Sequence, residues 1–97
     1  MKYKVRFDER AIQEAQEAYD YYEKQQIGLG DRFKDEMDKC IAYIQKNPNQ
    51  FKKVKREIRE ALVHKFPYLI VYGIINESII VAAVFHASRD PKKKLKK

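Results

Sequence analysis

The stretch YLIVYGIINESIIVAAVFH, residues 68–86, decides the fold of this chain. It contains two runs, Tyr68 to Ile75 and Ile79 to Phe85, that are rich in the β-branched and aromatic residues typical of strands. Asn76-Glu77-Ser78 between them indicates a hairpin turn. Alternation places two apolar sets on opposite faces of the first strand: Tyr68, Ile70, Tyr72 and Ile74, and Leu69, Val71 and Ile75. Because both faces are apolar, each face of the sheet needs a covering layer.

The residues before this hairpin predict one more strand. The segment from about Val54 to Phe66 is basic and carries spaced apolar residues at Ile58, Leu62 and Phe66. A short link containing Pro67 joins it to the hairpin. Three consecutive strands with short links predict an antiparallel meander.

The N-terminal half has a different periodicity. Tyr3, Val5 and Phe7 alternate with charged residues, which predicts a half-buried strand. Asp8 is a candidate N-cap for a helix to about Gln26. The apolar stripe of that helix has three- and four-residue spacings and consists of Ala11, Ile12, Ala15, Ala18, Tyr19 and Tyr22.

A second helix follows the segment Ile27-Gly28-Leu29-Gly30, where glycine can adopt the left-handed conformation of a helix end. Asp31 is its candidate N-cap, and Asn47-Pro48 ends it because the residue before proline disfavours helix. Its stripe consists of Phe33, Met37, Cys40, Ile41 and Ile44. We therefore predict an α+β fold: an N-terminal strand, then an antiparallel helical hairpin packed on one face of an antiparallel β-sheet. The other face could receive a partner.

Length and composition restrict the class of protein. The 97 residues are enough for a single domain, 1–97, with residues 92–97 as a flexible basic tail. One cysteine, Cys40, excludes an internal disulfide and fits a reducing compartment. No apolar run reaches the roughly 18 residues that span a bilayer. We expect a cytoplasmic protein without membrane contact.

The charge is divided unequally along the chain. Residues 1–51 carry nine Lys or Arg and ten Asp or Glu, whereas residues 52–97 carry twelve and four. This asymmetry favours polyanions such as nucleic acid, or an acidic protein, as partners of the second half. The basic residues just before the predicted hairpin are Lys52, Lys53, Lys55, Arg56 and Arg59. His86 and Arg89 follow it, and the groups could meet if the sheet folds back on itself.

An ordered set of short motifs resembles the RelE/ParE superfamily, the toxins of type II toxin–antitoxin modules. The set consists of Tyr21-Tyr22-Glu23, Gly28-Leu29-Gly30 with Phe33, Asn47-Pro48, Arg59, Phe66-Pro67-Tyr68 with Ile70 and Tyr72, Ala83-Val84-Phe85-His86, and Arg89-Asp90-Pro91. The resemblance covers nearly the whole chain. It is greatest to the ParE-type branch, whose members are often called plasmid stabilisation proteins.

This resemblance implies a growth-inhibiting toxin that forms a hetero-oligomer with a cognate antitoxin. The antitoxin would place an acidic, amphipathic segment over the basic sheet. A ParE-like toxin would inhibit an essential target such as DNA gyrase by binding alone. The alternative is a RelE-like, ribosome-dependent mRNA endoribonuclease, and a third hypothesis is an inactive or purely regulatory member.

The ribonuclease hypothesis assigns chemistry to three residues. Cleavage through the RNA 2′-hydroxyl needs a base, an acid and cations for the phosphorane charge. Arg59 and Arg89 are candidates for phosphate stabilisation, and His86 for base or acid. Both arginines have a purely structural alternative as ion-pair partners, and a strand-end histidine is usually structural. RelE-like enzymes commonly carry an aromatic residue in the segment after the arginine that corresponds to Arg89. This chain has no aromatic residue after Arg89, so the pattern favours ParE-like action.

The remaining candidates are binding residues. Lys52, Lys53, Lys55 and Arg56 would contact a nucleic-acid backbone or a protein target. The sequence has no metal-ligand spacing, and we expect no metal and no cofactor. Tyr68, Tyr72 and Cys40 lie on apolar stripes and are predicted to be core residues.

Overall fold

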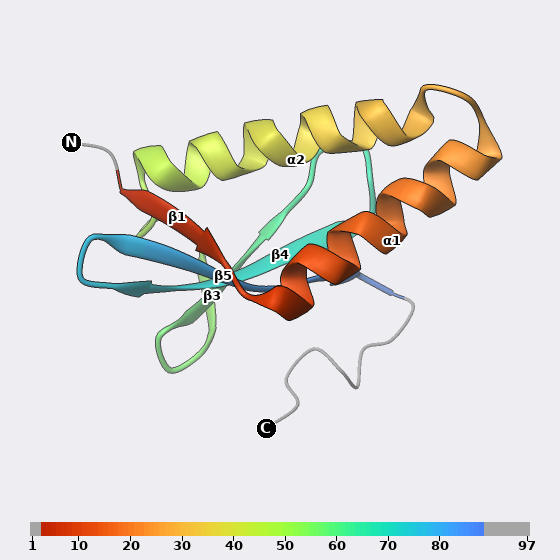
Figure 1. The fold of residues 1–97 in the computed structure, drawn as a ribbon. Helices are drawn as coiled ribbons and strands as arrows, with labels where there is room; N and C mark the ends of the chain where they lie inside the picture. The colour runs from red at the N-terminus through yellow and green to blue at the C-terminus, as the bar shows by residue number, and fades with distance from the viewer. Residues whose placement is uncertain (1–2, 89–97) are drawn as a thin grey trace.

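The computed structural model describes residues 3–88. The described part consists of two helices and five strands, which are coloured in chain order in Figure 1. The elements are β1 (Lys4–Phe7), α1 (Glu9–Gln25), α2 (Leu29–Lys46), β2 (Lys52–Lys55), β3 (Ile58–Leu62), β4 (Tyr68–Ile75) and β5 (Ser78–His86). Both helices lie on the same side of the sheet (Figure 1). This arrangement confirms the predicted α+β class. The predicted tail, 92–97, lies outside the described residues.

The five strands form one sheet in the order β1-β5-β4-β3-β2. Strands β2 to β5 are an antiparallel meander, and β1 pairs in parallel with β5. The decisive stretch forms the centre, since β4 and β5 pair from Tyr68 opposite His86 to Ile75 opposite Ser78. Asn76 forms the turn with a φ of 55°, a left-handed conformation that asparagine tolerates.

The meander has one strand more than the sequence predicted. Residues 54–66 are not a single strand, because β2 and β3 form a hairpin that turns at Arg56 and Glu57. Arg56 adopts a φ of 47° there, in a turn without the usual glycine or asparagine. The sequence does not predict β2 because Lys52–Lys55 contains a single apolar residue, Val54, and therefore shows no alternating pattern. Short basic strands of this kind are typical of sheet edges.

The helical hairpin is joined through a carboxylate that the sequence analysis did not assign. Gly28 is left-handed as predicted, with a φ of 90°, but α2 begins at Leu29 and not after Asp31. The backbone N–H groups of Gly28 and Gly30 donate to the two carboxylate oxygens of Glu23, each at 2.9 Å. Glu23, a residue of α1, thus caps the N-terminus of the next helix, α2. Asp31 instead accepts the Tyr19 hydroxyl at 2.7 Å.

The main core lies between the helices and the sheet. Its largest fully buried side chains come from both layers and are Tyr72, Phe33, Ile44, Ile70, Ile79, Val63, Val81 and Val84. Tyr68 and Cys40 are also buried, which confirms the core predictions for these residues. One stripe residue is an exception, because Ile12 on α1 is 55% exposed. Asp8 stands at the N-cap of α1, but its side chain makes no capping hydrogen bond.

Candidate functional site

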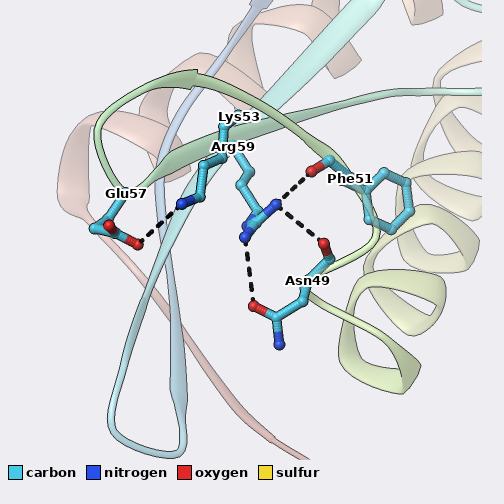
Figure 2. Close-up of polar contacts among 5 residues, drawn as sticks. All are labelled: Asn49, Phe51, Lys53, Glu57 and Arg59. Carbon is cyan, nitrogen blue, oxygen red and sulfur yellow. Dashed lines mark hydrogen bonds and ion pairs between the residues drawn. The ribbon is translucent and has the colours of Figure 1, made fainter.

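Arg59 on β3 is held by the segment between α2 and β2. Its Nη1 donates to the carbonyls of Asn49 at 3.0 Å and Phe51 at 2.7 Å, and its Nη2 donates to Asn49 Oδ1 at 3.4 Å. Figure 2 shows the guanidinium directed at these oxygens. A guanidinium has five N–H donors in a fixed fork, so these contacts fix its plane. Arg59 therefore ties the chain before β2 to β3.

Across the turn beside it, Lys53 and Glu57 form an ion pair. Lys53 Nζ lies 3.7 Å from Glu57 Oε1, and both side chains are well exposed (Figure 2). An exposed pair of this kind contributes little stability. The hairpin β2–β3 thus presents Lys52, Lys53, Lys55 and Arg56 to solvent.

His86 lies opposite the first residue of β4, Tyr68. It is the last residue of β5 and is half-buried. Its ring packs edge-on against Tyr68, with the ring centroids 5.3 Å apart. Its Nδ1 accepts the backbone N–H of Ser88 at 3.3 Å. His86 therefore closes the aromatic cluster of Tyr68, Phe33, Phe66 and Tyr22.

The structure does not bring Arg59 and His86 together. Arg59 is opposite Tyr72 and His86 is opposite Tyr68, on the two strands that flank β4. Four residues along a strand correspond to about 13 Å, and two strand spacings add about 10 Å sideways. Arg89 lies outside the described residues. A catalytic role for these three residues, and contact with a ligand by Lys52, Lys53, Lys55 or Arg56, stay predictions.

The second face of the sheet carries a smaller apolar cluster. It consists of Leu69, Val71, Ala83 and Phe85, with Ile58 and Ala87 packed against it. Both helices are on the opposite face (Figure 1). Ile75, at the end of β4, is 62% exposed. The register places Lys52 opposite Glu60 and Lys55 opposite Ile58, so these two lysines border the same face. An apolar surface with a basic border results.

Two buried groups are made unreactive by their surroundings. Burial raises the pKa of the Cys40 thiol to about 11. Burial also raises the pKa of Tyr72 to about 12, and its hydroxyl donates to the Pro48 carbonyl at 2.7 Å. Neither group is poised for proton transfer near neutral pH.

Residues 3–88, which the structure describes, contain neither a metal-ligand cluster nor a membrane-spanning helix. In this range no group of three or more His, Cys, Asp or Glu residues could hold a metal ion. No helix within it is long and apolar enough to cross a membrane.

Comparison with known proteins identifies the family. A family model described as the ParE toxin of the type II toxin–antitoxin system parDE matches residues 5–91. The chain belongs to this family. It is therefore a toxin of the ParE/RelE superfamily of type II toxin–antitoxin systems. No curated protein sequence matches it significantly.

Solved structures have the same fold. A structure described as the chromosomal ParDE system from P. aeruginosa superposes with a TM-score of 0.78 at 11% identity, covering 89% of this chain and 97% of that chain. A double arginine mutant of the E. coli toxin RelE in the free state superposes with a TM-score of 0.71 at 19% identity, covering 97% of this chain and 93% of that chain. The intact E. coli RelBE toxin–antitoxin complex superposes with a TM-score of 0.66 at 22% identity, covering 90% of this chain and 99% of that chain. The ParE family and the RelE toxins thus share one architecture with this chain.

Proposed function

We propose that this chain inhibits DNA gyrase by direct binding and that a cognate antitoxin neutralises it. The observation that carries the mechanism is the separation of Arg59 from His86. A ribonuclease needs its cations and its proton-transfer group around one scissile phosphate. Here the guanidinium of Arg59 donates to carbonyls of its own chain, several strand residues away from the imidazole. A toxin that acts by contact alone needs no such convergence.

The antitoxin part of the proposal is supported by the second face of the sheet. An acidic, amphipathic segment would cover the Leu69, Val71, Ala83 and Phe85 cluster and pair with the lysines at its border. The similar structures include toxin–antitoxin complexes, in agreement with such a partner. Burying both the apolar and the basic surface at once would mask the toxin.

One experiment separates gyrase inhibition from RNA cleavage. The chain is expressed from a tightly controlled promoter, purified gyrase is assayed for supercoiling, and mRNA integrity is followed in translating cells. We expect blocked supercoiling and intact mRNA. Cleaved mRNA with active gyrase would refute the binding mechanism and favour the ribonuclease, and His86→Ala should then abolish the cleavage.

A second experiment tests the antitoxin surface with matched charge reversals. Lys52→Glu combined with Lys55→Glu should weaken binding of the cognate antitoxin. Lys24→Glu combined with Lys46→Glu changes the net charge equally on the helices and should leave the affinity unchanged. Equal loss in both double variants would show that only the total charge of the toxin matters.

A further inference from the structure

The β2–β3 hairpin concentrates positive charge at one edge of the sheet. Residues 52–59 contain five Lys or Arg and one Glu, a net charge of +4. Lys52, Lys53, Lys55 and Arg56 are all exposed. β2 is the last strand in the sheet order, so one of its edges has no neighbouring strand. The turn of the hairpin projects from the sheet away from α1 and α2 (Figure 1), and the hairpin is therefore an accessible basic edge.

The turn of this hairpin contains a residue whose backbone conformation is unfavourable. Arg56 has a φ of 47°, in the left-handed region that glycine and, less readily, asparagine or aspartate adopt. A long side chain in this region costs free energy that glycine would not cost. Strained residues of this kind gather at functional sites. Here the strained residue is also the cation at the tip of the hairpin, which points to a role for its charge in binding.

The spacing of the exposed cations fits the backbone of duplex DNA. β2 has four residues and is about 13 Å long. One strand of a duplex places a phosphate about every 3.4 Å along the helix axis, so about four phosphates lie beside this length. The four exposed cations of β2 and its turn, at positions 52, 53, 55 and 56, match that number. Backbone N–H groups at a free strand edge can also donate to phosphate oxygens.

Two observations favour duplex DNA at this edge over RNA or over a polyanion bound elsewhere. Sequence-specific recognition of RNA uses unstacked bases that pack on aromatic side chains, and residues 52–59 contain no aromatic residue. Helices α1 and α2 carry six Lys or Arg and nine Asp or Glu, a net charge of −3. Because like charges oppose binding, the helical layer repels a polyanion, whereas the hairpin attracts it.

We propose that the β2–β3 hairpin binds the phosphate backbone of duplex DNA, so that the toxin contacts the DNA held by gyrase as well as the enzyme. The inference rests on the proposed gyrase inhibition, and it adds DNA to the target. Lys53 and Arg56 bind at the turn, and the exposed Glu57, whose Oε1 lies 3.7 Å from Lys53 Nζ (Figure 2), opposes binding. Phosphate contacts carry no sequence information, so the affinity falls with salt and does not depend on sequence.

Fluorescence anisotropy of the purified chain with a labelled duplex tests this contact without gyrase. Four phosphate contacts predict a slope of about −3 to −4 for the logarithm of the association constant against the logarithm of the salt concentration. Lys53→Ala combined with Arg56→Gly should make the slope less steep by about 2 and weaken binding at least about tenfold in about 0.1 M salt. Glu57→Gln should tighten binding. A slope near zero, or a double variant that binds like the wild type, would overturn the proposal.

Arg56→Gly and Lys65→Gly form a matched pair. Lys65 has a φ of 72°, so each glycine relieves left-handed strain and removes one positive charge. The five residues of β3, about 16 Å, separate the two positions, which exceeds the Debye length of about 10 Å in about 0.1 M salt. Both variants should keep or raise the Tm of the wild type, but only Arg56→Gly should weaken DNA binding. Equal losses of affinity would show that only total charge matters and would refute the proposal.

Two further measurements separate the proposal from its alternatives. If single-stranded RNA with the same number of phosphates binds more tightly than the duplex, the hairpin is an RNA contact and the proposal is wrong. In the supercoiling assay, Arg56→Gly should inhibit gyrase less than Lys65→Gly does. If both inhibit like the wild type, the DNA contact has no part in inhibition, and this inference fails while the proposed function stands. If the wild-type chain leaves gyrase active, the proposed function fails, and this inference falls with it even where the duplex binds.

Discussion

Replacing Gly30 by alanine tests how the helical hairpin is joined. A Cβ at this position would lie 2.8 Å from the Tyr19 carbonyl oxygen, 2.9 Å from Glu23 Oε1 and 3.1 Å from Glu23 Cβ. The first of these atoms belongs to the backbone of α1, so it cannot simply rotate away. Helix propensity alone predicts the opposite sign, since alanine stabilises a helix relative to glycine by up to about 1 kcal/mol.

The magnitude follows from what must move. To relieve the contact with the Tyr19 carbonyl, α1 and α2 must move apart, and this movement takes the Glu23 carboxylate away from the N–H groups of Gly28 and Gly30. A hydrogen bond to a charged group contributes about 1.5–3 kcal/mol. After the gain in propensity, we expect Gly30→Ala to lower the free energy of unfolding by about 2 kcal/mol. In a chain of this size that corresponds to a fall in Tm of roughly 10 °C.

Urea unfolding followed by circular dichroism measures this change. Gly73→Ala is the matched control, because its Cβ would meet Ile58 Cδ1 at 3.6 Å and the Glu57 carbonyl at 3.8 Å, which are ordinary contacts. The control should be neutral or stabilising by about 0.5 kcal/mol. Glu23→Ala should couple to Gly30→Ala by about 1 kcal/mol, because the two changes affect one cap. A Gly30→Ala protein as stable as the wild type would refute this account of the hairpin.

Further predictions concern Arg59, Tyr72 and Cys40. Arg59→Ala should lower the free energy of unfolding by about 1–3 kcal/mol in urea titrations. Arg59→Lys should restore little of this loss because an ammonium lacks the planar fork of a guanidinium. Full rescue by lysine would contradict the stabilising role of the hydrogen bonds from Arg59 to the Asn49 and Phe51 carbonyls. Tyr72→Phe should cost about 1–2 kcal/mol because it leaves the buried Pro48 carbonyl without a donor, and an unchanged Tm would disprove this. Burial raises the pKa of Cys40 from 9.0 to about 11, so iodoacetamide at pH 8 should alkylate it at least about 100-fold more slowly than an unfolded control. Because the folded state favours the neutral thiol, the contribution of Cys40 to stability is complete below pH 9 and is lost as pH rises towards 11. Urea titrations of the wild type and of Cys40→Ala across this pH range would detect the loss.

The sequence predicted the elements whose burial is strong. The sequence predicts β4 and β5 from their apolar runs, and α2 from the stripe of Phe33, Met37, Cys40 and Ile44. These elements bury most of their apolar residues, so their hydrophobic periodicity is clear in the sequence. Strand β2 was missed because a basic edge strand has almost no buried side chain to produce a pattern.

The candidate site was less predictable. The sequence identified the basic residues 52–59 and His86 as chemistry-bearing groups, but it contained no information on sheet register. The register puts Arg59 opposite Tyr72, near the middle of β4, and His86 opposite Tyr68, at its start, and loop carbonyls accept the hydrogen bonds of the guanidinium. Ile12 belongs to the predicted apolar stripe of α1 but is exposed, because periodicity marks a stripe without showing whether the neighbouring helix is near enough to cover it.

The sequence by itself therefore determined the fold class, the family resemblance and the charge of each half, since these depend on local periodicity and composition. Only the tertiary structure decided which groups meet. It placed Glu23 under the start of α2, Arg59 on the carbonyls of Asn49 and Phe51, and Glu14 Oε1 2.8 Å from the Val84 backbone N–H, 70 positions away in the chain. The physical reason is that hydrogen bonds and electrostatic contacts depend on distances of a few ångströms between segments, which pairing and packing set after the local structure has formed.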